Sequence, residues 1–416
     1  MRLAIIGGGA AGMATAYLLH EAHDITVFEK QPMLGGNIRT LNRNVQGTGL
    51  RQDRTLENGV IEFLQADGSY FEALMADLGV KLAYVRSVST QLFRLDCSYL
   101  QAPGVIRDSN LHPVTRIGRY GKLLRLAIPQ WQLDRKIKNT ESWKGHPVSN
   151  LLDSDTLGIW YKMLLMYSYS IPYAEIDNLP AELALMILNS VAVGTRWNRI
   201  VGGVYTYIER ILACFTGTVH CDVTINAIKR QNDRVSIRLH DDTTHDFDAV
   251  IFATPPDQVL QLLGDADDDE IRRFGGWKAN HAVTVVHTDM QMYDPYGHPH
   301  YSAFDVFEKT GGTDAGYNAY LNDLCGIDDK RVAYSMAYNM HDQIDPQTII
   351  HHQQHHTPRY TVDAFTYRDE VIATNGHNRI YHAGAYLSDG LHNGAIESAN
   401  RVSVLLGGKD LRVNNP

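Results

Sequence analysis

Three glycines near the start of the sequence have a spacing that suits dinucleotide binding. Gly7, Gly9 and Gly12 form a G-x-G-x-x-G pattern, with Ala10 and Ala11 between the last two. The first glycine permits a tight turn, the second lets the backbone approach a pyrophosphate, and the third lets a helix pack closely on a strand. Glycine-rich turns also close ordinary strand–helix junctions, so the neighbouring elements must decide between these two interpretations.

The elements around the glycines favour a cofactor site. Residues 3–6 are an apolar run typical of a buried strand, and residues 13–21 continue as a helix. The N–H groups at the start of that helix would face the phosphates. A second strand over 24–28 ends at Glu29, whose carboxylate can accept hydrogen bonds from an adenosine ribose and would repel a 2′-phosphate. We assign Glu29 and the adjacent Lys30 to the cofactor contacts.

A second glycine pair indicates which dinucleotide is bound. Gly35 and Gly36, followed by Asn37 and Arg39, lie shortly after the acidic residue. This segment resembles the second glycine pair of FAD proteins in the flavin-containing amine oxidase superfamily. The resemblance implies that the loop follows the pyrophosphate and ribityl chain of FAD, with the basic residue near the phosphates. Asn37 stands where the family usually has Arg, while Arg39 remains; taken alone, the segment also fits a surface turn.

Further segments resemble the same superfamily and occur in the family's order. The resemblance implies that the backbone of Val223 holds the adenine, that Gly384 and Ala385 line the cofactor site, and that the N–H groups of Gly394 and Ala395 face the flavin. The segments are residues 197–210, a Gly-Gly entry into a helix; 221–225, the adenine strand; 248–256, the strand that closes the nucleotide domain; and 380–395, the carboxyl-terminal flavin motif.

These matches predict an α/β fold in which a Rossmann-like FAD-binding domain of the GR2 type carries an inserted α+β substrate-binding domain. The FAD-binding domain is expected in three blocks, 1–85, 195–262 and 370–410. The substrate-binding domain is expected in two, 86–194 and 263–369. Within the latter, residues 114–192 have helix-like apolar clusters, 265–270 form an acidic run that we expect to be solvated, and 282–286 form a strand.

Departures from the amine oxidases of this superfamily point to a different substrate. The family's Lys beside the flavin aligns with Ala282, its two aromatic rings align with Ser388 and Leu391, and its acidic residue at the ribityl chain aligns with Ala385. A branch encoded beside cyclopropane fatty-acid synthases is more similar. Short sequence motifs of that branch match residues 384–386, 390–392, 287–289, 344–346 and, more loosely, 60–80. That resemblance implies an oxidoreductase or isomerase that acts on a hydrophobic, acyl-like substrate.

Two other functions stay open at this stage. One is an amine oxidase that acts on an amine or an amino-acid-derived compound. The other is a non-catalytic lipid-binding module, because guanine-nucleotide dissociation inhibitors share this fold without using flavin. A catalytic role is assigned to His392, whose pKa range suits acid–base work near neutral pH; the alternative is a histidine that only holds a loop. FAD is expected to be noncovalent, because the carboxyl-terminal motif has no Cys.

Two clusters of residues have more than one interpretation. The histidines in 351–356 could form i, i+4 metal-binding pairs on a helix, but no carboxylate or thiolate nearby completes a ligand set, so we predict no metal site and a polar helix end before Pro358. The Met- and Tyr-rich residues 161–173 could line an apolar pocket or fill a helical core, and core packing is the default.

Composition excludes several classes of protein. The 416 residues carry a net charge of −9, with no long stripe of Lys and Arg, so nucleic acid is not an expected partner. The four cysteines are far apart, which suits a reducing cytosol. No apolar run reaches about 20 residues, so no membrane-spanning helix is expected. The sequence predicts a cytoplasmic enzyme with a small hydrophobic substrate, for which contact with a membrane surface stays open.

Overall fold

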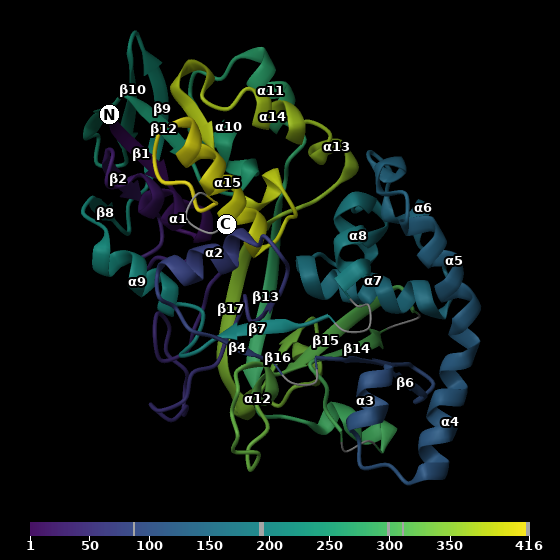
Figure 1. The fold of residues 1–416 in the computed structure, drawn as a ribbon. Helices are drawn as coiled ribbons and strands as arrows, with labels where there is room; N and C mark the ends of the chain where they lie inside the picture. Colours follow the sequence, from purple (N-terminus) through teal and green to yellow (C-terminus); the bar gives the residue numbers. More distant parts are fainter. Residues whose placement is uncertain (86–87, 191–194, 298–299, 310–311, 413–416) are drawn as a thin grey trace.

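The computed structural model describes residues 1–85, 88–190, 195–297, 300–309 and 312–412. Within these residues the strands form four sheets. Figure 1 shows a parallel sheet with its helices at one end of the molecule and a large mixed sheet with a group of helices at the other. The long strands β13 (Ala279–His287) and β17 (Ile349–Pro358) run between the two ends.

The parallel sheet has the strand order β18-β12-β1-β2-β8. Its central strands are mostly apolar and buried, because helices and a smaller sheet cover its faces, whereas the edge strand β8 is Thr-Val-His and partly exposed. Helices α1 (Ala10–Leu19) and α15 (His392–Leu405) pack against each other beside it. The strands are β1 (Arg2–Ile6), β2 (Asp24–Phe28), β8 (Thr218–His220), β12 (Ala249–Phe252) and β18 (Ile380–His382), all from the three blocks predicted for FAD binding.

One strand of this sheet lies earlier than predicted. The edge strand β8 pairs with β2 over Thr218–His220, whereas residues 221–224 form no strand. Asp222 has a φ of 59° and turns the chain away from the sheet edge. The predicted strand over 221–225 is therefore wrong by a few residues, and Val223 lies in the connection that follows β8.

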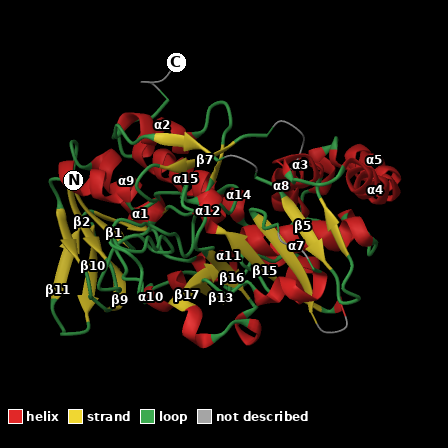
Figure 2. Cartoon of the chain, turned by 90° about the horizontal axis from the view of Figure 1, so that it is seen from below, coloured by secondary structure: helices red, strands yellow, loops and turns green. Residues whose placement is uncertain are grey.

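Two small sheets accompany the parallel sheet. The antiparallel sheet β11-β10-β9 stands beside β1 and β2 in Figure 2. A second small sheet, β3-β7-β4, joins segments that are far apart in the sequence. The strands of these sheets are β9 (Ile225–Gln231), β10 (Arg234–Leu239), β11 (Thr244–Phe247), β3 (Phe63–Leu64), β4 (Leu82–Tyr84) and β7 (Trp197–Ile200). The blocks predicted for FAD binding also contain the helices α2 (Tyr70–Asp77), α9 (Thr206–Cys214) and α10 (Val259–Leu262).

The large mixed sheet has the order β17-β13-β16-β15-β14-β5-β6. Its pairs are antiparallel except for β14 with β5. The predicted strand over 282–286 forms the middle of β13. The other strands are β5 (Thr90–Phe93), β6 (Tyr99–Gln101), β14 (Phe304–Lys309), β15 (Asp314–Tyr320) and β16 (Ser335–Tyr338), and the short helices are α12 (Leu321–Leu324), α13 (Val362–Phe365) and α14 (Arg368–Ala373).

Helices predominate between residues 103 and 190, which agrees with the helical pattern predicted over 114–192; residues 191 and 192 lie outside the described residues. Helices α4 and α5, linked by a 3-10 turn over Leu124–Leu126, lie at the outer edge of the molecule (Figure 2). Among the described residues, no helix is long and apolar enough to cross a membrane. The helices are α3 (Pro103–Asp108), α4 (Pro113–Leu123), α5 (Ala127–Ile137), α6 (Val148–Leu151), α7 (Thr156–Tyr169) and α8 (Ala181–Ser190).

The histidine-rich stretch is a strand, and the predicted helix end is wrong. Residues 351–356 lie in β17 and pair with β13, so neighbouring side chains point to opposite faces. His355 is buried, whereas His352 is exposed. The i, i+4 histidine pairs of a helix therefore do not form. No group of metal-ligating side chains occurs in the part of the chain that the structure describes.

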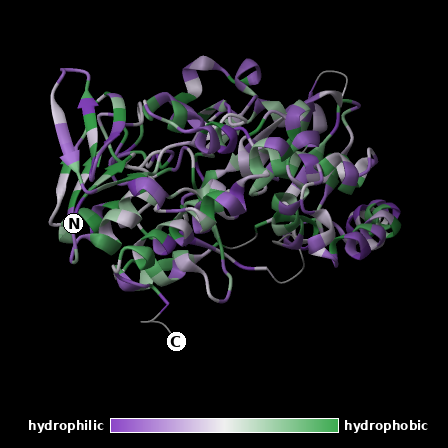
Figure 3. Cartoon of the chain, turned by 90° about the horizontal axis from the view of Figure 1, so that it is seen from above, coloured by the Kyte–Doolittle hydropathy of each residue, from purple (hydrophilic) through white to green (hydrophobic). Residues whose placement is uncertain are grey.

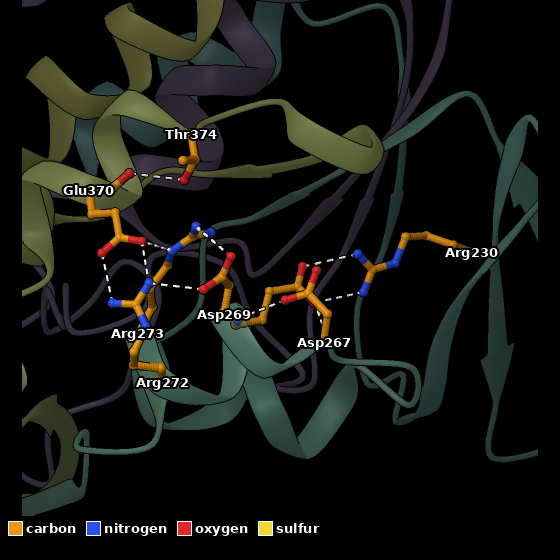
Figure 4. Close-up of polar contacts among 8 residues, drawn as sticks. Arg230, Asp267, Asp269, Arg272, Arg273, Glu370 and Thr374 are labelled. Atoms are coloured by element: carbon orange, nitrogen blue, oxygen red, sulfur yellow. Dashed lines mark hydrogen bonds and ion pairs between the residues drawn. The ribbon is translucent and has the colours of Figure 1, made fainter.

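The acidic run before α11 (Asp268–Phe274) is not simply solvated. Asp267 caps the helix, and the side chain of Glu270 bonds back to the N–H of Asp267 in a capping box. Glu270 is buried and forms an ion pair of 2.7 Å with Arg230 of β9. On the other side, Arg272 and Arg273 both pair with Glu370 of α14 (Figure 4). Glu270 together with Arg272 and Arg273 of α11 thus connects β9 with α14.

Candidate functional site

The two predicted cofactor loops lie against each other. The N–H of Gly35 donates to the carbonyl oxygen of Gly8 over 2.8 Å. A methyl group built on Gly9 would meet only backbone atoms of Gly36, at 3.6 and 3.9 Å, so the polypeptide leaves room there. Gly36 has a φ of 58°, which favours glycine. The two loops therefore leave a space at Gly9 in which a ligand can lie close to the backbone.

The acidic residue at the end of β2 is held in place by backbone groups. Glu29 is buried, and its Oε2 accepts the N–H of Gly8 over 2.7 Å. Its Oε1 accepts the N–H of Gln31, also over 2.7 Å. The carbonyl oxygen of Glu29 accepts the N–H of Val223 over 3.0 Å, which brings the predicted adenine contact beside the predicted ribose contact. Lys30, by contrast, is exposed.

The start of α1 and the side chain of Arg39 suit an anionic group. Gly9 caps α1, and among the described residues no side chain bonds to this helix start. The N–H groups of Ala10 and Ala11 thus lie at an open helix end with a positive dipole. Arg39 is buried, and its Nη1 donates to the carbonyl oxygen of Ile38. Among the described residues, no carboxylate forms an ion pair with Arg39. Burial lowers the pKa of Arg39, while Glu29 and Tyr205 oppose that shift.

A polar network lies on the inner face of β13 and β17. Thr284 donates to the side-chain oxygen of Asn58 and contacts Nε2 of His355 at 2.9 Å. Asn58 in turn contacts Nδ1 of His351 at 2.8 Å. Burial, together with the charge of Arg39, lowers the pKa of His355 to about 3. The histidine-rich strand therefore presents neutral imidazole beside the buried guanidinium, and it supports the loop that contains Asn58.

The start of α15 is capped by a residue that the sequence analysis missed. Asp389 Oδ1 accepts the N–H groups of Leu391 and Gly394 over 2.7 and 3.0 Å. The N–H of Ala395 donates to the carbonyl oxygen of Leu391. The predicted contacts of Gly394 and Ala395 to the flavin would therefore compete with bonds inside the chain. Burial raises the pKa of Asp389. The signal was present in the sequence, because an Asp shortly before a helix is a common cap.

Gly384 and Ala385 lie where β18 leads into the carboxyl-terminal motif. The N–H of Gly384 donates to Oγ of Ser398 over 2.8 Å, which ties the end of β18 to α15. A methyl group on Gly384 would meet the ring of Tyr386 at 2.7 Å, so the turn has no room for a side chain. These contacts place both residues between the parallel sheet and α15.

His392 packs among aromatic rings rather than beside acids or bases. Its Nε2 lies 2.9 Å from the hydroxyl of Tyr207, and its ring meets Phe63, Phe71 and Tyr207 edge-on. Desolvation lowers the pKa of His392 to about 4. A histidine that is neutral at pH 7 and surrounded by rings is poorly placed to donate a proton there. The catalytic assignment stays a prediction, and this packing argues against it.

Glu62 is a better acid–base candidate, which the sequence analysis passed over. The hydroxyl of Tyr167 donates to Oε1 of Glu62 over 3.0 Å, with Oε2 at 3.2 Å. Desolvation raises the pKa of Glu62 to about 7, although the Tyr167 bond opposes the shift. Leu64, two residues on, lines a hollow of about 530 Å³ together with Met186. The only signal in the sequence was a lone carboxylate in the apolar stretch 60–64.

The raised pKa of Glu62 predicts a measurable pH dependence of stability. Between the ordinary pKa of 4.5 and about 7, Glu62 is protonated in the folded chain and ionised in the unfolded chain. The contribution of Glu62 to the free energy of unfolding is therefore fully present at low pH and is lost as the pH rises through that window. If Glu62 were fully buried, the free energy of unfolding would decrease by about 3 kcal/mol across this window. Partial exposure of the side chain makes that decrease smaller. We expect chemical unfolding to show a smaller decrease between about pH 5 and about pH 8 in Glu62→Gln than in the natural chain. Equal decreases would show that Glu62 is solvated.

The three positions aligned with the amine-binding residues offer no amine-binding group. Ala282 is buried on β13, on the same strand face as Thr284. The hydroxyl of Ser388 donates to Glu397, and Leu391 packs against the main hydrophobic core. Residues 163–166 are buried in that core, as expected by default.

Two short phrases singled out in the sequence meet at the end of β13. Asp289 Oδ2 accepts the N–H of Asp345 over 2.8 Å, and Oδ1 accepts the N–H of Gln291. His287 is fully buried, and its Nε2 contacts the side-chain oxygen of Asn318 at 3.0 Å. The motifs at residues 287–289 and 344–346 therefore connect the end of β13 to the turn that leads into β17. They contribute to the architecture of the mixed sheet.

Comparison with protein-family models matches residues 10–288 to the flavin containing amine oxidoreductases. The chain belongs to this family. The match covers well over half of the sequence; it begins within the first predicted cofactor loop, at Ala10, and includes the whole of the second. The chain is thus an FAD-dependent oxidoreductase, and the non-catalytic alternative no longer fits. Comparison with curated protein sequences finds no match.

Solved structures with a similar fold act on different compounds. Putrescine oxidase bound to putrescine has 12% identity and a TM-score of 0.66, covering 97% of this chain and 98% of its own. Cyclohexylamine oxidase from Brevibacterium oxydans IH-35A has 13% identity and a TM-score of 0.66, covering 98% and 99%. A CLA-producing fatty acid isomerase from P. acnes has 18% identity and a TM-score of 0.64, covering 98% of both chains. At these identities the likeness shows the fold alone.

The residues present fit FAD. The open start of α1, the buried Arg39 and the room at Gly9 suit a pyrophosphate. Glu29 suits a ribose, because each carboxylate oxygen can accept a further hydrogen bond. Family membership and local geometry therefore agree on the cofactor.

Proposed function

We propose that this oxidoreductase removes a hydride from a carbon of a hydrophobic, acyl-like substrate, as a dehydrogenase or as an isomerase. The observation that carries the proposal is the replacement of the amine-binding positions by Ala282, Ser388 and Leu391. An ammonium group would find no lysine-bound water and no aromatic pair at these positions. The similar fold of a fatty acid isomerase is consistent with this substrate class.

The proposed roles of the residues follow from their contacts. FAD, when bound, supplies the hydride acceptor. Loss of hydride leaves an electron-poor carbon in the substrate, and loss of a proton from the neighbouring carbon gives a double bond. The carboxylate of Glu62 takes that proton, because a pKa of about 7 lets it gain and lose a proton near neutral pH. Tyr167 holds the carboxylate in one orientation. An isomerase would leave that proton on the substrate, or return it from Glu62, and would return the hydride to a different carbon of the same chain.

A second candidate function is the oxidation of an amine. Glu62 favours it, because an ionised buried carboxylate attracts a cation. The ring of Tyr167 beside it would offer a cation–π face. We rank this function second, because Tyr167 already packs against Phe304 and Tyr317, with ring centroids 4.5 and 4.8 Å apart.

Anaerobic flavin bleaching separates the two functions. The purified holoenzyme is mixed without oxygen with a panel of saturated and unsaturated fatty acids and with a panel of primary and secondary amines. The acyl proposal predicts bleaching, or a shift of the flavin spectrum, with fatty acids only. Rapid bleaching by a simple amine, with no response to any fatty acid, would establish the second candidate.

We also expect the FAD to be noncovalent. Cys97, Cys214, Cys221 and Cys325 all lie outside the carboxyl-terminal motif, and Cys325 is enclosed beside Glu57. Acid precipitation of the yellow protein should therefore release all flavin into the supernatant. Flavin that stays on the polypeptide would show a covalent link and would contradict this expectation.

A further inference from the structure

An amphipathic segment at the outer edge of the molecule turns its apolar side to solvent. Helices α4 and α5 with the turn between them span residues 113–137, and no side chain of α4 is buried. Figure 2 shows these helices as the outermost elements, at the end of the molecule away from β1 and β2, and Figure 3 shows hydrophobic and hydrophilic residues mixed there. The side that packs on the protein includes the buried Leu133.

The exposed apolar residues form one stripe. They recur at helical spacing and are large, with exposed fractions of 72% for Ile117, 74% for Leu124 and 69% for Ile128. Val114, Tyr120 and Trp131 extend the stripe at 71%, 39% and 57%. Single exposed apolar residues are ordinary, but a contiguous apolar surface rimmed by polar groups marks an interaction site.

The charge around this stripe is of one sign. Between residues 109 and 133 the sequence contains Arg116, Arg119, Lys122 and Arg125, and no Asp or Glu. This contrasts with a net charge of −9 for the whole chain. Arg125 is exposed beside the stripe, whereas Arg119 and the exposed Lys122 lie over the ring of Tyr99 of β6, at 4.1 and 5.9 Å from its centroid. The outward surface therefore combines apolar side chains with uncompensated positive charge.

We propose that residues 113–131, here called the basic apolar stripe, dock the protein on an anionic lipid bilayer. An amphipathic helix with cations beside large apolar side chains inserts its apolar side into the headgroup boundary and attracts anionic lipids. A second copy of this chain is the less suitable occupant, because a symmetric contact would bring Arg125 toward its own copy. A bilayer supplies both the apolar layer and the opposite charge. The proposal holds for any substrate of the enzyme.

Vesicle co-sedimentation of the holoenzyme tests the proposal. The vesicles are phosphatidylcholine alone and phosphatidylcholine mixed with phosphatidylglycerol, each at low and high salt. The natural protein should bind the mixed vesicles at low salt and bind more weakly to neutral vesicles or at high salt. The double variant Leu124→Ser, Ile128→Ser should bind at least about tenfold more weakly. Lys122→Glu with Arg125→Glu should lose the preference for phosphatidylglycerol.

A matched variant controls for loss of any exposed apolar side chain. Ile271→Ser on α11 changes a residue that is 51% exposed but lies outside the stripe, and it should bind vesicles like the natural chain. The visible spectrum of bound flavin should stay unchanged in all variants, which shows that they fold. No binding by the natural protein, or equal binding by the double variant, would overturn the proposal. A dimer in solution that dissociates in the double variant would also overturn it and assign the stripe to self-association.

Discussion

Gly9→Val should abolish the retention of FAD while the chain still folds. Gly9 has an extended backbone with φ −77°, which any residue adopts, and a methyl group there keeps ordinary distances to Gly36. The added side chain would instead occupy the space that a pyrophosphate needs. We expect the purified variant to be colourless, with a far-ultraviolet circular dichroism spectrum like that of the natural apoprotein. Gly9→Ala should weaken FAD binding by about tenfold or more, which corresponds to about 1.4 kcal/mol.

Gly12, the third glycine of the same motif, supplies the matched control. A methyl group on Gly12 would lie 1.9 Å from the carbonyl oxygen of Gly7, so Gly12→Ala should damage the strand–helix junction itself. That variant should lose both flavin and thermal stability, whereas Gly9→Val loses flavin alone. Stoichiometric flavin in Gly9→Val would show that the first glycine motif shapes the backbone only.

Glu62→Gln should slow flavin reduction by the true substrate by a factor of about 10² to 10⁴, the usual contribution of general acid–base catalysis. In the natural enzyme the rate should rise with pH through about 7, because the proposed base must be ionised, and that step should disappear in the variant. Tyr167→Phe should keep the step and shift it to higher pH, since the Tyr167 bond lowers the pKa of Glu62. Stopped-flow spectra under anaerobic conditions measure these rates. An unchanged pH profile in Glu62→Gln would exclude Glu62 as the base.

The parallel sheet was predictable because its signals are local. Strands β1 and β12 are short apolar runs, β1 leads directly into the first glycine motif, and Gly7, Gly35 and Gly36 have positive φ values that glycine adopts easily. The strand β8 was misplaced because 221–225 is also apolar, whereas pairing with β2 selects Thr218–His220. A tertiary contact thus decided between two local patterns.

Side-chain environments were harder to predict than elements. The spacing in 351–356 permits both a helix and a strand, and pairing with β13 over nine residue pairs selects the strand. His392 looked chemically useful by its type, but aromatic rings from β3, α2 and α9 surround it. Glu62 looked like an ordinary carboxylate, but burial in the folded chain raises its pKa, and the hydroxyl that opposes this shift comes from Tyr167, 105 residues away. Long-range contacts of this kind leave no pattern in one sequence.

The most direct test of the acyl-substrate proposal compares ligands of matched chain length. Fatty acids of increasing length and the primary amines of the same lengths are titrated against the oxidised holoenzyme, and the flavin spectrum reports binding. Burial of one methylene contributes about 0.8 kcal/mol, so each added carbon pair should tighten fatty-acid binding by roughly tenfold or more until the site is filled. Anaerobic bleaching should follow with the fatty acids of best fit. Affinity that is independent of acyl length, with bleaching by short amines, would contradict the proposal.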